Sequence, residues 1–261
     1  MNSPQRLALL CVVAASLFTA GAQPKNPLPP IVPLDPDVAK QEARVLITNL
    51  LGRIPEASTT NTGTLTITPR NGKERAVKLR LDVVATATNW LNVYETVIPD
   101  AGPLREKLTV IHTENQPNEY LLESSAPGAT NSTTKRLTGN ATMIPFAGSD
   151  FWLADLGLEF LHWPTQRLLK HHQMSHSTIC DVLESINPQR GPGAYVKVIS
   201  YIAVESGGIV EAQAYDAEEK ALKIFIPKKF EKVNGQWQVE EVRMENHPDK
   251  SKSVLHFDLG H

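Results

Sequence analysis

The chain has 261 residues, of which 41% are hydrophobic and 21% are charged, and its formal net charge at pH 7 is −2. A charge so close to zero excludes the basic surface that nucleic-acid-binding domains carry, so we expect no nucleic-acid partner. The length is enough to bury one hydrophobic core, and all-β chains of this size commonly form a single domain.

The first 22 residues have the pattern of a secretory signal peptide. Arg6 supplies the positive charge, an apolar run covers residues 7–18, and Ala20-Gly21-Ala22 forms a small-residue cleavage site before Gln23. The apolar run has about 12 residues, whereas a membrane-spanning helix needs roughly 20, so we expect the segment to be removed. The sequence therefore predicts an exported protein of the periplasm, without a transmembrane segment in the mature chain.

The chain contains two cysteines, and only one remains after this cleavage. Cys11 lies inside the apolar run and follows Leu9-Leu10, not the small residues that precede a lipid-modified cysteine. Cys180 is then without a partner, which excludes an intramolecular disulfide even in an oxidising compartment. We expect Cys180 to be a small, buried and unreactive side chain.

Residues 23–36 contain six prolines and are predicted to form an extended linker before the fold. A helix follows, because Asp35 can cap its first turn and Pro36 suits its first position. Gly52 or Pro55 ends the helix. Its apolar residues recur at helical spacing, at Ala39, Ala43, Leu46, Ile47, Leu50 and Ile54. Residues 37–261 are predicted to form one domain.

Strand patterns dominate the chain from Gly63 onward. Residues 79–88 show the clearest alternation, with Leu79, Leu81 and Val83 on the face that we expect to be buried. Gly207-Gly208 and Asn234-Gly235 suit tight hairpin turns, and residues 127–138 are interpreted as a loop. Further strands are predicted over residues 63–68, 90–98, 107–113, 119–124, 167–171, 177–185, 194–203, 208–215, 221–226, 236–244 and 253–257.

The penultimate strand changes parity along its length. Trp237 and Val239 share one parity, whereas Val242 and Met244 share the other. A β-bulge near Glu240-Glu241 would bring all four side chains to the inner face.

A second helix is predicted over residues 151–163. Asp150 or Ser149 can cap its N-terminus, and Pro164 ends it. Its apolar face would hold Leu153, Leu156, Gly157 and Phe160.

About a dozen strands with short turns predict a mainly β fold with antiparallel pairing. The two amphipathic helices need a surface that covers their apolar faces. An incomplete, strongly curved antiparallel β-barrel with the helices packed in its open mouth satisfies both requirements, and a two-sheet sandwich is the alternative.

Short motifs between residues 104 and 258 carry a family resemblance. Gly148-Ser149-Asp150-Phe151, followed by Asp155-Leu156, looks like a Ser-Asp-Phe helix entry, and Cys180-Asp181-Val182-Leu183-Glu184 looks like a Cys-x-Val-Leu-Glu strand. A Tyr-Asp turn and a closing Trp strand are matched by Ala214-Tyr215-Asp216 with Lys223, and by Trp237 with Met244-Glu245-Asn246. Together these motifs resemble the outer-membrane lipoprotein-sorting (LolA-like) family, whereas residues 37–103 match it in layout only.

The resemblance implies a LolA/LolB-like half-barrel that shelters lipid. The expected function is that of a periplasmic carrier for lipid or for the acyl chains of a lipoprotein, with an inner-membrane donor or an outer-membrane acceptor as further partners. It implies no cofactor, and we expect a monomer. The residues expected to line the lipid cavity or its lid are Phe151, Trp152, Leu156, Phe160, Trp163, Leu81, Val83 and Trp237.

No catalytic or metal-binding motif competes with this interpretation. His171, His172 and His176 form the one cluster of metal-ligating residues, but adjacent histidines on a strand point to opposite faces, so a solvated hairpin turn is the better interpretation. The chain lacks the Gly-x-Ser-x-Gly elbow of serine hydrolases. Asp150 and Asp155 are interpreted as cap and turn residues, so we expect a protein that is not an enzyme.

An alternative function uses the same fold. A barrel whose interior is filled with side chains would serve as an interaction module for a protein partner in the envelope, without lipid cargo. A continuous apolar cavity of several hundred Å³ inside the barrel would favour lipid binding, whereas a packed interior would favour the alternative.

Overall fold

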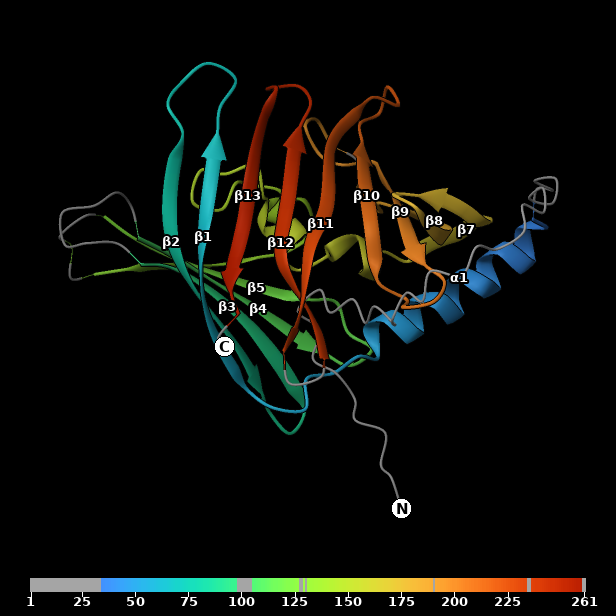
Figure 1. Cartoon of the computed structure of the whole chain (residues 1–261), viewed down its shortest axis with the longest axis horizontal. Coiled ribbons are helices and arrows are strands. Elements are labelled where there is room, and N and C mark those ends of the chain that lie inside the picture. Colours follow the sequence, from blue (N-terminus) through green and yellow to red (C-terminus); the bar gives the residue numbers. More distant parts are fainter. Residues whose placement is uncertain are drawn as a thin grey trace.

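The computed structural model describes residues 34–97, 105–126, 129, 131–189, 191–233 and 236–259 (Figure 1). The predicted signal peptide (1–22), most of the predicted linker (23–36) and the predicted Asn234-Gly235 turn lie outside the described residues, as do the side chains of residues 232, 233, 236 and 237. The elements in chain order are α1 (Pro36–Leu51), β1 (Thr59–Thr68), β2 (Arg75–Ala85), β3 (Asn89–Val97), β4 (Arg105–Thr113), β5 (Glu119–Ser125), β6 (Thr133–Leu137), η1 (Gly139–Thr142), α2 (Leu153–Leu156), η2 (Glu159–His162), β7 (Thr165–Ser175), β8 (Thr178–Ile186), β9 (Lys197–Ala203), β10 (Ile209–Tyr215), β11 (Ala221–Val233), β12 (Gln236–Asn246) and β13 (Ser251–Asp258).

The described strands form one 13-stranded sheet in the order β6-β5-β4-β3-β2-β1-β13-β12-β11-β10-β9-β8-β7. Every neighbouring pair is antiparallel, and all but one of the pairs join strands that are consecutive in the sequence. The exception is the pair of β1 with β13, which joins the two halves of the chain. The sheet is strongly curved and its edge strands β6 and β7 do not pair, which confirms the incomplete antiparallel barrel (Figure 1).

The chain passes from one edge of the sheet to the other through the interior of the barrel. Residues 138–164, which we call the crossing segment, leave the sheet after β6, form η1, α2 and η2, and rejoin it at β7. The segment therefore fills part of the barrel. Its buried side chains belong to the same core as the inner faces of the strands, and they include Phe146, Phe151, Leu153, Phe160, Leu161 and Trp163.

Helix α1 lies along the open side of the sheet next to β7 (Figure 1). The Asp35 carboxylate accepts a hydrogen bond from the N–H of Asp37 (2.9 Å) and Gly52 follows the last turn, which confirms the predicted cap and end. Among the described residues, none of the helices has the length and apolar composition needed to cross a bilayer. The side chains that α1 buries are Ala39, Ala43, Ile47 and Leu50.

The pairing of β12 with β11 confirms the predicted bulge. Lys229 of β11 pairs with Glu241, and Phe230 pairs with Val239, so Glu240 is an extra residue in β12. As a result, the described inner residues on both sides of the bulge are buried. The alternation predicted for β2 is also confirmed, since its inner residues Leu79, Leu81 and Val83 are buried.

The predicted helix over residues 151–163 is wrong. The structure has two short helical turns, α2 and η2, separated by Leu158 in the left-handed conformation (φ 49°). Gly157 lies so close to Tyr120 that a Cβ at this position would overlap the phenol oxygen. The apolar spacing of this stretch is compatible with a helix, but its packing against β5 overrides that local preference.

The predicted loop over residues 127–138 is wrong at its C-terminal end. β6 (Thr133–Leu137) pairs with β5 and forms one edge of the sheet. Four of its five residues are exposed. A short, polar edge strand has the composition of a loop, because it has no inner face to bury.

The three clustered histidines are exposed, as expected, but they do not share one turn. Only His176 lies in the hairpin turn, whereas His171 and His172 lie at an irregularity within β7. The His171 imidazole bridges Glu42 of α1 (2.9 Å) and Asp181 of β8 (3.1 Å). Within the described ranges, no group of three or more His, Cys, Asp or Glu side chains could hold a metal ion.

Cys180 on β8 is fully buried, as predicted, and is a free thiol. Burial raises the pKa of this thiol to about 11, and the nearby Asp181 and Glu211 carboxylates add to the shift. The thiolate is the reactive form, so both access and ionisation protect this side chain.

We predict that Cys180 of the secreted protein reacts with a thiol reagent at pH 8 at least about 100-fold more slowly in the native state than in denaturant. The release of the reagent's chromophore measures the rate, and the Cys180→Ser variant gives the background. Equal rates in the native and unfolded protein would place the thiol at an accessible surface instead.

Candidate functional site

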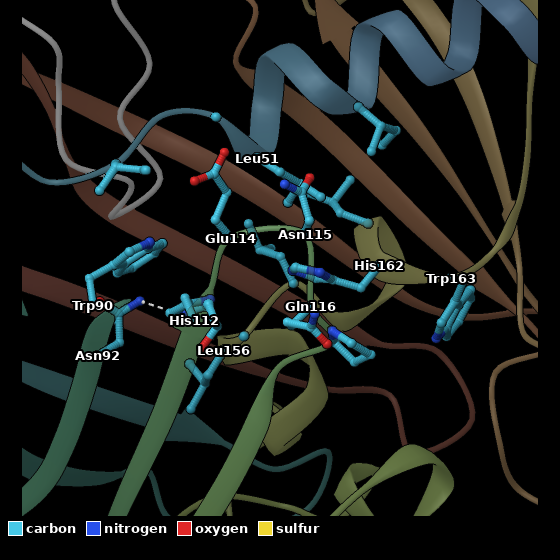
Figure 2. Close-up of a pocket in the computed structure, with 18 of the residues that line it drawn as sticks. Leu51, Trp90, Asn92, His112, Glu114, Asn115, Gln116, Leu156, His162 and Trp163 are labelled. Atoms are coloured by element: carbon cyan, nitrogen blue, oxygen red, sulfur yellow. Dashed lines mark hydrogen bonds between the residues drawn. The ribbon is translucent and has the colours of Figure 1, made fainter. Parts of the chain in front are cut away.

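A cavity of about 1090 Å³ opens between α1, the crossing segment and the concave side of the sheet. Its walls come from α1, the β2–β3 turn, β3, β4, the β4–β5 loop and the crossing segment, and β11, β12 and β13 form its floor. Figure 2 shows some of the lining residues. The interior of the incomplete barrel is therefore partly filled and partly open.

Apolar atoms form the larger part of the cavity surface. Leu51 of α1 and Leu156 of the crossing segment lie on opposite walls (Figure 2). Such a surface suits a hydrocarbon group, because ligand pockets are mostly apolar with a few placed polar groups. The other apolar lining residues include Ile47, Ile54, Phe151, Leu158, Leu161, Trp163, Phe225, Val242, Leu255 and Phe257.

Polar side chains gather where β3 and β4 reach the cavity. The Trp90 indole stacks on the His112 imidazole with 3.7 Å between ring centroids, and Asn92 Nδ2 lies 3.4 Å from His112 Nε2. All three side chains are more than nine-tenths buried. His162 points into the same space from the crossing segment (Figure 2). We call Trp90, Asn92, His112 and His162 the polar corner.

Burial keeps both histidines of the polar corner uncharged. It lowers the pKa of His112 to about 3, and the neighbouring His162 adds to this shift. Burial likewise lowers the pKa of His162 to about 4. At pH 7 each ring is a neutral imidazole with one donor and one acceptor nitrogen, so the polar corner offers hydrogen bonds without charge.

The charged residues that line the cavity lie mainly at its rim. Lys40 and Arg44 on α1 and Glu114 in the β4–β5 loop are exposed. Asp155 is buried, and its carboxylate already accepts hydrogen bonds from the Trp152 N–H and the Tyr195 hydroxyl. A ligand that enters the cavity therefore passes exposed charges before it reaches walls that are mostly uncharged.

The structure brings together some of the residues predicted from the sequence. Phe151, Leu156 and Trp163 line the cavity. Phe160 is buried in the core and is not a lining residue. Trp152 stacks on Tyr195 at 4.4 Å and faces a second, smaller hollow.

The three remaining predicted residues are not placed at the cavity. Leu81 and Val83 are buried on β2, where they pair with the lining residues Tyr94 and Asn92 of β3 but do not line the cavity themselves. The side chain of Trp237 lies outside the described residues. A lipid-facing role for the predicted set stays a prediction.

Asp150 anchors the crossing segment to the last strand. Its carboxylate accepts hydrogen bonds from the hydroxyls of Ser251 (2.6 Å) and Ser253 (2.7 Å) on β13 and from Asn246 Nδ2 (3.1 Å). Its backbone N–H donates to Ser253 Oγ (2.9 Å), and its carbonyl accepts from Lys223 Nζ (2.6 Å). The motif residue Asp150 therefore has a structural role that its partners explain completely.

A second buried network continues from this anchor. The N-cap residue of α2 is Trp152, not Asp150 or Ser149, and the carboxylate of Asp155 within the helix accepts a hydrogen bond from the Trp152 N–H (2.8 Å). The Tyr195 hydroxyl donates to the same carboxylate (3.0 Å), and Lys223 Nζ lies 3.8 Å from it and 3.6 Å from the centre of the Trp152 ring system. Burial lowers the pKa of Lys223 to about 8, although the carboxylates around it oppose that shift.

A third buried group connects the crossing segment with β5. The Tyr120 hydroxyl donates to Glu159 Oε2 (2.8 Å), and Asn118 Nδ2 donates to the Gly157 carbonyl (2.8 Å). Burial raises the pKa of Glu159 to about 7, against the effect of these donors. An ionised Glu159 is therefore costly to the folded protein at neutral pH.

Sequence reasoning missed the polar corner, because no local motif marks it. The alternation along β3 could have revealed it. Trp90, Asn92 and Tyr94 occupy every second position of the strand, and all three are buried on its inner face. A polar residue among inner positions is unusual and points to a structural or functional need. His112 is a similar exception on the inner face of β4.

We predict that Asp150→Ala lowers the free energy of unfolding by about 2–4 kcal/mol, because it leaves two hydroxyls and one amide without their buried acceptor. Asp150→Asn keeps one acceptor oxygen and should lose less. Denaturant unfolding followed by circular dichroism measures both. A loss below about 1 kcal/mol for Asp150→Ala would show that the anchor does not hold the crossing segment.

We predict that Glu159→Gln stabilises the protein at pH 8 by on the order of 1–3 kcal/mol and has little effect at pH 4. The folded-state pKa of about 7 exceeds the ordinary 4.5, so the wild-type protein loses stability as the pH rises from about 4.5 to 7. Glutamine keeps an acceptor for Tyr120 without this loss. Urea unfolding at several pH values tests the difference, and Glu114→Gln at the exposed rim is the control that should show no such trend.

The comparisons with known proteins identify the family and the fold. A family model with the description "Uncharacterized protein" matches residues 129–259, which is half of the chain. No curated protein matches the sequence significantly. The solved structures that are similar over most of their length include three with TM-scores above 0.5. A DUF1329 family protein from Desulfovibrio piger has a TM-score of 0.68 and 15% identity, covering 85% of this chain and 95% of that one.

The other two are LolA-like by description. A domain described as an outer membrane lipoprotein-sorting protein from Vibrio parahaemolyticus has a TM-score of 0.63 and 17% identity, covering 87% of this chain and 93% of that one. A LolA superfamily protein from Nitrosomonas europaea has a TM-score of 0.57 and 15% identity, covering 84% and 91%. The chain therefore belongs to the family of that matching model, and its curved half-barrel is the LolA-like fold.

Proposed function

We propose that the protein binds lipid, or the acyl chains of a lipoprotein, in the cavity between α1 and the crossing segment. The observation that carries this proposal is a continuous cavity of about 1090 Å³ with a mostly apolar lining. This volume lies slightly above the usual range for small-molecule pockets, which is about 300–1,000 Å³. The likeness to lipoprotein-sorting structures supports the same class of ligand.

The energetics fit a carrier that can release its cargo. Burial contributes ~0.8 kcal/mol per methylene, so a fully enclosed chain of about fourteen carbons would gain on the order of 10 kcal/mol. The cavity opens at a rim of exposed residues on α1 and the β4–β5 loop, which would leave part of the chain near water. A membrane or an acceptor protein can then compete for the cargo.

We further propose that the protein acts in the periplasm as a binding protein and not as an enzyme. The pattern of residues 1–22 supports export through a cleaved signal peptide. An inner-membrane donor and an outer-membrane acceptor are the partners that such a carrier would need, and the proposal requires no cofactor. The alternative interaction module predicts a filled barrel, and the open cavity favours the carrier over it.

We predict that Leu51→Asp lowers the amount of lipid that copurifies with the protein at least about tenfold. Leu51 lines the cavity, and a carboxylate there would have to lose its water when hydrocarbon fills the space. Mass analysis of organic-soluble material measures the cargo, and circular dichroism checks the fold. Because the cavity is empty space next to a partly buried residue, the unliganded variant should still fold.

Val45→Asp is the matched control on the same helix. Val45 is 57% exposed, so the same charge there should leave the lipid content unchanged. Full lipid content in a folded Leu51→Asp variant would show that this cavity is not the lipid site. A wild-type protein that carries no organic-soluble material and binds no acyl probe would favour the interaction module.

A further inference from the structure

We propose that the polar corner binds the uncharged, hydroxyl-bearing head of an amphiphile, such as an acylglycerol, whose chain lies against the apolar walls. This inference rests on the proposed function, because it names the class of lipid that the same cavity would select. It depends on three observations: an unsatisfied buried amide, the absence of charge on the corner, and the position of the corner within the cavity.

The first observation is an unpaired polar atom. Asn92 is 4% exposed and lines the cavity, and its side-chain oxygen has no hydrogen-bond partner among the residues that the structure describes. Turning the amide by half a turn would pair the oxygen with His112 and leave the nitrogen unpaired instead. One amide atom lacks a hydrogen-bond partner in either orientation. This is costly for a buried group unless a ligand supplies the missing hydrogen bond.

A hydroxyl is the group that fits both orientations. It can donate to an unpaired amide oxygen or accept from an unpaired amide nitrogen. His112 Nε2 already lies against the Asn92 amide. The neutral imidazole of His162 bonds to the Gln116 backbone through one nitrogen, so its other nitrogen can bond to a ligand in the same space. A head with more than one hydroxyl, such as glycerol, could engage the amide and an imidazole together.

The second observation concerns charge. The four members of the polar corner carry no charge at pH 7, and no cation lies among them to pair with a phosphate or carboxylate. The cationic lining residues Lys40 and Arg44 lie on the exposed surface of α1 at the rim. An ionised head placed in the corner would lose its water without a counter-charge, and that loss is much larger than for a hydroxyl.

The third observation is the arrangement of polar and apolar surface. The corner lies on β3, β4 and η2, whereas Leu51 on α1 and Leu156 on the crossing segment give the lining its apolar walls (Figure 2). Val242 on β12 and Phe257 on β13 belong to the apolar floor. A ligand with a compact neutral head and a hydrocarbon chain matches both parts.

The test compares ligands that share one chain and differ in the head. Displacement of a fluorescent acyl probe from delipidated protein measures the affinities of monomyristoylglycerol, methyl myristate, myristate and a lysophosphatidic acid with the same chain. We expect monomyristoylglycerol to bind about tenfold more tightly than methyl myristate, which lacks the hydroxyls, and more tightly than both anions. Asn92→Leu should abolish this preference while the affinity for methyl myristate changes less than about twofold.

Gln116→Leu is the matched control, because Gln116 is an exposed amide at the rim of the same cavity. This variant should keep the preference for monomyristoylglycerol.

Equal binding of monomyristoylglycerol and methyl myristate, a preference that survives in Asn92→Leu, or a preference for the anions would overturn the inference and leave acyl binding intact. Failure of all four ligands to displace or bind would instead remove the proposed function itself. The comparison of ligands on the wild-type protein decides the matter even if Asn92→Leu does not fold.

Discussion

The hydrogen bonds between Asp150 and β13 determine how the interior of this barrel is divided. The two edge strands do not pair, so the crossing segment is the connection between them, and its path decides which part of the interior is filled. Asp150 ties that path to Ser251 and Ser253 at the centre of the strand order. Directly after this anchor in the chain, Trp152 faces a small hollow, whereas Phe151 and Leu156 line the large cavity.

The buried charged residues near the cavity are bonded to partners within the protein. Asp155 and Lys223 are both almost fully buried, but each is surrounded by donors, acceptors or an aromatic ring. Such groups are tolerated because their partners are complete, and removing one partner from a buried pair is strongly destabilising. Apart from Asp155, whose hydrogen-bond partners are internal, the buried polar residues of the cavity walls include His112 and Asn92, which are neutral. A neutral, mostly apolar wall can exchange water for hydrocarbon without the desolvation cost that a buried charge imposes.

The sequence predicted the sheet well, because its signals are local and repeated. Alternation in β2, the cap at Asp35 and the parity change around Glu240 each depend on a few neighbouring residues, and all are confirmed. The helix predicted over residues 151–163 failed, because contacts of Gly157 and Glu159 with Tyr120, 37 or more positions away in the sequence, override the local spacing. The motif residues Asp150 and Asp155 have structural roles, whereas Phe151 and Leu156 line the cavity. The polar corner is assembled from three separate segments, so no single stretch of sequence could reveal it.

The hydrophobic surface that holds α1 in place is continuous with the surface that would hold the cargo. Ile47 belongs to the core and also lines the cavity, and Leu51 packs against that core from the next turn. Polar interactions that hold α1 and the residues after it are partly exposed. They include the hydrogen bond between Glu42 and His171 and the one from Arg53 to the Ser206 carbonyl (2.9 Å). A chain bound in the cavity would extend the core beneath α1 and bind only to the folded state. By linkage, such a ligand must hold α1 more firmly in place, and any partner that pulls α1 away must weaken the hold on the ligand by the same free energy.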